Sequence, residues 1–433
     1  MKRASLQTEE FLKSLSGRGQ WVHAHSTRTA NLTVRSDNLQ NHRRAESLDL
    51  AVLSFIDRPQ SVFARRALFQ VHLWLGVATG LYIFVVCATG AALVFRIDMQ
   101  RALHPDLFTP SAAGPPADPV AIMNSVTSAY PGERLSGIDA PTTARPTYLA
   151  YTSSGKTFRT LLLDPVTATM LGELAETSFV RTIQDLHFDL LGGRTGRVIN
   201  GVGAAVLALM GMTGLVIWWP GHSNWRRSLL VDVRRNWKRI NWDLHSATGF
   251  WTAALVLMWA LTGVYFAFPS AFRSTINWIS PITVSRAPQS SARNGREPLP
   301  WRRLVDEAQR QAQGQHVARV VVPSSDKAAF LVQFSPVRPT PLGADLLSVY
   351  LDQYSATVLT QASPPTRTAG DVVMTWVAPL HVGNFGGIGI RIAWLVLGLA
   401  PPLLFVTGFI MWWTRVVRVR WVRVAQPAAE AAQ

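Results

Sequence analysis

Four long apolar segments interrupt an otherwise polar chain, and they give the first structural prediction that the hydrophobic pattern allows. They cover residues 64–95, 199–219, 246–268 and 389–413 of the 433-residue sequence. Each is long enough to cross the roughly 30 Å hydrocarbon core of a bilayer as a helix. The sequence therefore predicts an integral membrane α-helical protein with four transmembrane helices.

Two long polar segments, residues 96–198 and 269–388, lie between the first and second and between the third and fourth apolar segments. Each begins with a proline-rich passage and continues with a helical pattern, Asp118 to Tyr130 in one and Trp301 to Gln313 in the other. Alternating apolar positions typical of strands follow. These runs are Tyr148–Thr152, Arg159–Asp164, Ala318–Val322, Phe330–Phe334 and Leu347–Asp352. Each segment is thus expected to form a small α+β domain.

The two halves of the chain repeat each other, and the repeat includes four histidines. His72 and His245 are followed at equal offsets by Gly76, Thr79, Thr89 and Gly90 and by Gly249, Thr252, Thr262 and Gly263. His187 and His381 are followed at equal offsets by Gly192, Gly193, Arg197, Thr213, Gly214, Trp218 and Trp219 and by Gly386, Gly387, Arg391, Thr407, Gly408, Trp412 and Trp413. Both halves cross in the same order, which predicts parallel repeats about an axis along the membrane normal.

The position of the positive charge predicts the orientation. The formal net charge is +16, and arginines cluster before the first span, in the link 220–245 and in the tail 414–433. The positive-inside rule places these segments and both termini in the cytoplasm, and the two α+β domains in the periplasm of a bacterial inner membrane. Because the basic residues follow the membrane borders and no recognition motif accompanies them, we expect no nucleic-acid partner.

The remaining parts of the sequence add little chemistry. Residues 1–60 are polar and arginine-rich without sustained periodicity, which predicts a disordered cytoplasmic extension. The single cysteine, Cys87, lies in the first apolar segment, so neither a disulfide framework nor a cysteine-based haem attachment is expected. No constellation of residues for nucleophilic or proton-transfer catalysis is found.

The histidines are the candidate functional residues, because an ionisable side chain in or beside a membrane span is costly. Parallel repeats place equivalent residues at equal depth and therefore pair His72 with His245 and His187 with His381. A single such helix would be explained by close packing of small residues. Two facing imidazoles above glycine-lined helix faces instead suit a bis-histidine haem. Zinc or copper is less suitable, since no third ligand recurs beside these positions. We therefore predict two b-type haems with these four axial ligands.

Two matched arginines, Arg197 and Arg391, follow the second pair of histidines by ten residues. Arginine on the outer side of the membrane runs against the usual charge bias, and haem propionates would give both residues partners. The alternative is that they reach to the interface or contact the outer domains.

Several phrases resemble those of the PepSY-associated transmembrane-helix family. They are VHLWLGVATGLYIFVVCATGAALVF followed by HPDLF, the phrase LDPVTAT, and LHFDLLGG with TGLVIWWP, together with their second-half copies. The family includes iron-regulated inner-membrane proteins and ferric-siderophore reductases. The resemblance implies four spans, two periplasmic PepSY-like domains, haem held by His72, His245, His187 and His381, and reduction of ferric siderophores.

The resulting hypothesis is a transmembrane electron carrier. It would take electrons from a cytoplasmic donor or the quinone pool and reduce Fe(III) in a siderophore or other chelate held between the two outer domains. One alternative is a membrane-anchored PepSY scaffold that binds a peptide or regulates a peptidase without redox activity. Another is a transporter, which the absence of Asp or Glu at mid-depth in the spans disfavours.

Overall fold

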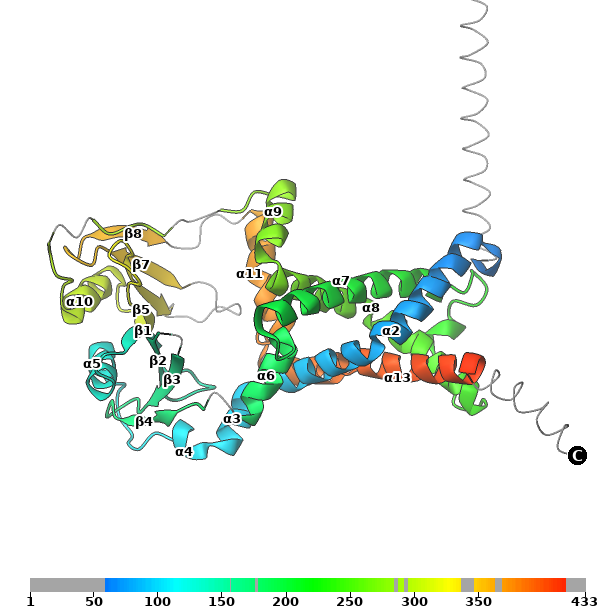
Figure 1. Cartoon of the computed structure of the whole chain (residues 1–433), viewed down its shortest axis with the longest axis horizontal. Helices are drawn as coiled ribbons and strands as arrows, with labels where there is room; N and C mark the ends of the chain where they lie inside the picture. The colour runs from blue at the N-terminus through cyan, green and yellow to red at the C-terminus, as the bar shows by residue number, and fades with distance from the viewer. Residues whose placement is uncertain are drawn as a thin grey trace, which may run out of the picture. The chain divides into compact units, whose positions relative to one another are not determined.

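The computed structural model describes residues 59–155, 157–175, 178–283, 287–291, 295–335, 346–362 and 368–417 (Figure 1). The predicted extension 1–60 and tail 414–433 therefore lie almost wholly outside the described residues. Residues 59–71 and 216–230 belong to one compact unit, in which Arg65 donates a hydrogen bond to the carbonyl of Ile217 at 2.5 Å. All four candidate histidines belong to the second unit, which spans His72–Leu215 and continues from Val231.

The four predicted spans are confirmed as long apolar helices. They are α2 (Phe63–Leu93), α7 (Gly193–Trp218), α8 (Trp237–Ala267) and a fourth segment from Gly387 to Val417. The predicted link 220–245 ends earlier than expected, because α8 begins at Trp237 behind an Asn236 side chain that accepts a hydrogen bond from the Arg239 amide. Because the helix begins at Trp237, His245 lies inside it.

The fourth span is divided into α12 (Gly387–Gly398) and α13 (Ala400–Trp412), followed by a π-helical turn from Trp413 to Val417. The sequence pattern predicted one continuous helix. Pro401 and Pro402 have no amide hydrogen to donate to the preceding turn, so the helix restarts with them in its first turn.

Small residues bring the helices of the two halves together. An added Cβ at Gly80 of α2 would lie 2.2 Å from the Phe405 ring of α13, and one at Gly263 of α8 would lie 3.2 Å from Ala204 Cβ of α7. Gly211 of α7 faces Leu257 of α8 in the same way, at 3.0 Å. Such small residues let helix backbones approach closely in a membrane.

Several short helices lie along the chain outside the four apolar segments. The helix α6 (Phe179–Asp189) precedes α7 and carries His187, and α11 (Ala369–Val382) precedes α12 and carries His381. The others are η1 (Pro59–Ser61), α3 (Arg96–Leu103), α4 (Pro105–Phe108), η2 (Arg227–Leu229) and α9 (Pro269–Ile279).

The two α+β segments form one antiparallel sheet of eight strands in the order β4-β3-β2-β1-β5-β6-β7-β8. The first half supplies β1 (Arg134–Asp139), β2 (Tyr148–Ser154), β3 (Thr157–Leu163) and β4 (Met170–Glu173). The second supplies β5 (His316–Val321), β6 (Phe330–Ser335), β7 (Leu347–Leu351) and β8 (Val358–Ala362). The sequence predicted two such domains but neither their edge-to-edge union nor β1, β4 and β8.

One face of the sheet is covered by α5 (Pro119–Ala129) and α10 (Trp301–Gln311), the two predicted helices of the α+β segments (Figure 1). Their apolar residues form one core with the inward-facing strand residues of both halves, including Ile122, Leu304 and Phe330, which are fully buried. On the other face α4 packs Leu107 and Phe108 against Leu162 of β3. A single core therefore links the two repeats.

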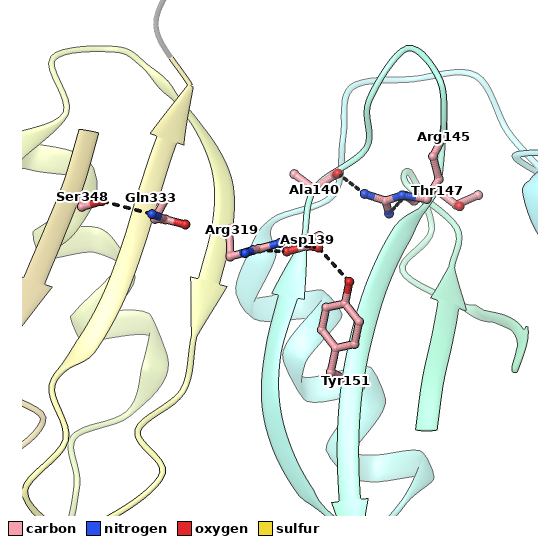
Figure 2. A network of polar contacts seen from close by, with 8 residues as sticks. All are labelled: Asp139, Ala140, Arg145, Thr147, Tyr151, Arg319, Gln333 and Ser348. Carbon is pink, nitrogen blue, oxygen red and sulfur yellow. Dashed lines mark hydrogen bonds and ion pairs between the residues drawn. The ribbon is translucent and has the colours of Figure 1, made fainter. Parts of the chain in front are cut away.

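The junction between the halves is the pairing of β1 with β5, in which Asp139 lies opposite Arg319. Gly137 is necessary for this close approach, since a Cβ there would lie 2.4 Å from the Val320 carbonyl oxygen. The Arg319 guanidinium donates to both carboxylate oxygens of Asp139, at 2.5 and 3.0 Å (Figure 2). The ion pair thus joins the two repeats at the centre of the sheet.

The repeated LDPVTAT phrase forms a tight turn around a buried aspartate in each half. Asp164 accepts hydrogen bonds from the amides of Ser111, Val166 and Thr167 and from the Ser111 hydroxyl. Burial opposes ionisation, but these hydrogen bonds dominate and hold the pKa of Asp164 below its usual value. Asp352 has the same role in the second half, where it accepts from the amides of Ser291, Tyr354 and Ser355.

Candidate functional site

The first pair of candidate histidines lies inside the spans. His72 is on α2 and places Nδ1 3.1 Å from the Thr213 hydroxyl of α7, and His245 is on α8 and places Nδ1 2.9 Å from the Thr407 hydroxyl of α13. Each imidazole is therefore tied by one ring nitrogen to the neighbouring span of its own half.

The second pair lies on the short helices α6 and α11. His187 Nδ1 is 2.9 Å from the Val86 carbonyl of α2 and 3.4 Å from the Thr89 hydroxyl, and His381 Nδ1 is 2.7 Å from the Thr262 hydroxyl of α8. The centres of the two imidazole rings are 6.2 Å apart, with an angle of 45° between the ring planes. The structure thus brings together the two histidines that the repeat symmetry paired.

This second pair is held in the neutral form. Burial lowers the pKa of His187, and burial together with the neighbouring His187 lowers the pKa of His381 to about 3. A neutral imidazole whose Nδ1 carries the hydrogen keeps the lone pair on Nε2, which is the form that binds a metal. Burial and the hydrogen bonds at Nδ1 therefore favour, in both rings, the form that could bind a metal.

The two pairs are separated along the helices. Thr89 follows His72 by seventeen residues on α2, and Thr262 follows His245 by seventeen residues on α8. At about 1.5 Å per residue the pairs lie about 25 Å apart along the axis. This distance is most of the roughly 30 Å hydrocarbon thickness, so one pair lies toward each surface of the membrane.

The imidazole pairs fit a haem better than a bare metal ion. In the part of the chain that the structure describes, no group of three or more His, Cys, Asp or Glu side chains could hold a metal. A metal bound by two imidazoles alone would lack ligands, whereas a porphyrin supplies four nitrogens and leaves two axial positions. Imidazole nitrogens at about 2.0 Å on either side of a metal separate the ring centres by about 6 Å, close to the spacing of His187 and His381.

The two arginines of the repeat have different surroundings. The Arg391 guanidinium forms an ion pair with Asp98, donates to the Val94 carbonyl at 3.1 and 3.3 Å, and lies 4.4 Å from the centre of the Phe95 ring. Arg197 is exposed and makes no hydrogen bond or ion pair with any residue that the structure describes. Arg391 thus has protein partners, and Arg197 remains available to an anion.

The repeat includes four threonines for which no role was predicted: Thr89, Thr213, Thr262 and Thr407. Each of these threonines contacts one of the four histidines. Their equal offsets in the two halves were the available signal. The contacts join different helices, however, and spacing along one helix does not reveal them.

A polar row crosses the sheet on the face opposite α5 and α10. Tyr151, Asp139, Arg319, Gln333 and Ser348 come from β2, β1, β5, β6 and β7, and a Gln333 to Ser348 hydrogen bond of 3.1 Å extends the row into the second half (Figure 2). Burial and the hydrogen bond to Asp139 raise the pKa of Tyr151 to about 12, so its hydroxyl remains protonated.

Comparison with protein families places the chain. Residues 69–415 match the model of the PepSY-associated TM region. The match covers most of the sequence, and the chain belongs to this family of membrane proteins. A comparison with curated proteins gave no match.

Proposed function

We propose that this protein carries electrons across a bacterial inner membrane and reduces ferric iron held in a siderophore or similar chelate on the periplasmic side. His72 with His245 and His187 with His381 would each hold one b-type haem by its axial positions. When bound, haem supplies reversible one-electron Fe(III)/Fe(II) chemistry. The electron would come from a cytoplasmic or quinone donor.

The observation that supports the proposal best is that all four histidines present the same chemistry. Each uses Nδ1 in a hydrogen bond to a threonine of another helix, which leaves Nε2 as the coordinating nitrogen. Structural histidines do not need a common ring nitrogen, a common partner type and pairing by repeat symmetry. Binding of the same kind of cofactor by both pairs would account for all three.

The reaction needs little from the protein beyond binding and spacing. One electron converts the chelated Fe(III) to Fe(II), and no covalent bond to the protein forms or breaks. An oxygen-rich chelator is a hard ligand set and holds Fe(II) less tightly than Fe(III), so reduction releases the iron. The protein would contribute neutral imidazoles, separation of the two pairs along α2 and α8, and a docking surface for the chelate.

The pairing of β1 with β5 disfavours a chelate held between two separate outer domains, which the sequence suggested, because the two strands are joined edge to edge. The face of the sheet that carries the polar row from Tyr151 to Ser348 is the remaining candidate surface, because α5 and α10 cover the other face.

The decisive experiment is an absorption spectrum of the purified full-length protein from haem-replete cells, oxidised and then reduced, with haem measured per chain. We expect a b-type spectrum with two haems per chain. The variants His72→Ala and His245→Ala should each retain one haem. Dithionite-reduced protein should be reoxidised by a ferric siderophore, with Fe(II) trapped by ferrozine.

The rival function, a PepSY scaffold that binds a peptide or regulates a peptidase, would give a well-folded and colourless protein. A haem-free wild type from haem-replete cells would thus contradict the proposal. A haem-loaded wild type that ferric chelates do not reoxidise would retain the haem assignment and refute the reductase activity.

A further inference from the structure

Each of the four histidines contacts a threonine on a neighbouring helix, and each threonine is followed by glycine. Thr89 contacts His187, Thr213 contacts His72, Thr262 contacts His381 and Thr407 contacts His245. The distances from Nδ1 to the threonine Oγ1 are 3.4, 3.1, 2.7 and 2.9 Å in that order. The same two-residue element therefore occurs four times, on four different helical segments.

The threonine hydroxyls act as acceptors toward the histidines. Each Oγ1 lies 2.8 Å from the carbonyl oxygen four residues earlier in its own helix, at Val85, Leu209, Met258 and Leu403. A hydroxyl has one hydrogen to donate, and these carbonyls can only accept. The threonine oxygen therefore accepts from the imidazole, which requires hydrogen on Nδ1 and none on Nε2.

The glycines leave room for the rings. A Cβ added at Gly90 would lie 2.6 Å from His187 Cε1, and one at Gly214 or Gly408 would lie 3.1 or 3.2 Å from Cε1 of His72 or His245. Cε1 lies between the two ring nitrogens, so such a Cβ would displace the ring edge that carries Nε2. The fourth glycine, Gly263, faces Ala204 instead of a histidine.

We infer that the Thr-Gly pairs are positioning elements, in which the threonine fixes the imidazole tautomer and the glycine, where it faces the ring, admits that ring edge. The inference deepens the proposed function and rests on it. The threonines would act on the haem through the histidines that they contact. An acceptor on Nδ1–H makes the imidazole a stronger donor to the metal and stabilises Fe(III) relative to Fe(II).

The elements differ within the second pair, and the difference makes the inference testable. His187 Nδ1 has the Val86 carbonyl at 2.9 Å in addition to the more distant Thr89 hydroxyl. His381 Nδ1 has the Thr262 hydroxyl at 2.7 Å as its hydrogen-bond acceptor among the described residues. Removing the hydroxyl should therefore disturb His381 more than His187.

The test compares Thr262→Val, Thr262→Ser and Thr89→Val in the full-length protein by potentiometric titration followed by absorbance, with haem quantified per chain. For Thr262→Val we expect one of the two midpoint potentials to rise and haem affinity at that site to fall about tenfold. The serine variant should restore both values. Thr89→Val should shift the same haem less.

Thr127→Val is the control. Thr127 lies on α5, outside the spans, and donates to the Met123 carbonyl at 3.1 Å, and no histidine among the residues that the structure describes forms a hydrogen bond with it. It should leave both potentials unchanged. If Thr262→Val does not accumulate, Thr407→Val tests the 2.9 Å bond to His245, and there the other haem should shift.

The outcomes separate the two hypotheses. A haem-free wild type refutes the proposed function and, with it, the positioning role. If the wild type binds haem but Thr262→Val has the same potentials and haem content, the positioning role alone is refuted. An equal shift in Thr127→Val would refute it as well.

Discussion

The two halves of the chain hold their histidines in the same way and differ in almost everything around them. Asn200 of the first half donates to the His187 carbonyl at 2.6 Å, whereas the equivalent Trp394 donates to the Leu380 carbonyl at 2.7 Å. Trp394 also packs against Trp259 and Phe385 in edge-to-face contacts. Both side chains thus tie a histidine-bearing helix to the following span by unlike means.

The contacts that recur in both halves are those of the histidines, and the contacts that differ are packing contacts around them. The His–Thr contacts recur, but the polar Asn200 environment of His187 is replaced by an aromatic one near His381, whose ring lies 5.1 Å from Phe266. The two halves therefore share the His–Thr contacts and differ in the packing around them.

The largest effect should come from the second pair of histidines, His187 and His381. His187→Ala and His381→Ala each remove one of the two imidazoles whose ring centres are 6.2 Å apart, so each should lower haem content from two to one per chain. Equal loss in the two variants, with the reduced spectrum of the remaining haem unchanged, would show that both halves contribute to one site. Loss of haem in only one of the two variants would show that the two halves do not contribute equally to the site.

The next effect concerns the junction between the halves. Gly137→Ala should destabilise the sheet by about 1–3 kcal/mol, because the added Cβ overlaps the Val320 carbonyl oxygen at 2.4 Å and forces the strands apart. Thermal unfolding in detergent measures the change. Gly389→Ala is the control, since an added Cβ there meets nothing within 4 Å. An unchanged melting temperature in Gly137→Ala would mean that the halves do not depend on the junction.

The sequence predicted the spans and the histidine pairing because both rest on periodic signals. Span length follows from the bilayer, and equal offsets in parallel repeats define equal depth. The β1–β5 junction carried no such signal: β1 reads RLSGID, and only its pairing explains why glycine stands at position 137. Its partner lies almost 200 residues away in the chain.

The contacts between the histidines and the threonines were not predicted for a related reason. Thr213 and His72 are 141 residues apart and lie on different helices, so their contact depends on how α2 packs against α7. For the matched arginines the repeat predicted too much. Equal spacing predicted equal roles for Arg197 and Arg391, but only Arg391 has an acidic partner, Asp98. The position equivalent to Asp98 in the second half is Ala271, so Arg197 lacks the corresponding carboxylate.

A smaller effect is expected at the buried turn aspartates. Asp164→Asn should lower stability at pH 7 by about 1–3 kcal/mol, since the carboxylate accepts four hydrogen bonds. Asp352→Asn should lower stability in the same direction, because Asp352 accepts hydrogen bonds from the amides of Ser291, Tyr354 and Ser355. Melting temperatures of the two variants give the comparison.

The pH dependence has a definite sign. The folded-state pKa of Asp164 lies below its ordinary 3.8, so its contribution is complete above about pH 5 and is lost as the pH falls toward the folded-state value. The difference between the wild type and Asp164→Asn should therefore shrink on acidification. A difference that stays constant from pH 7 to pH 3 would contradict the role of the ionised carboxylate.

The smallest effect should distinguish the two arginines. Arg391→Gln removes the ion pair with the half-exposed Asp98 and should cost about 1 kcal/mol, whereas Arg197→Gln should leave the melting temperature unchanged because Arg197 has no protein partner among the described residues. Asp98→Asn should match Arg391→Gln, and the double variant should add little to either. If Arg197 serves an anion such as a propionate, Arg197→Gln should instead change the haem spectrum or potential. If Arg197→Gln alters neither the melting temperature nor the haem spectrum or potential, Arg197 has no part in the site. The prediction that the two arginines bind an anion would then hold for neither of them.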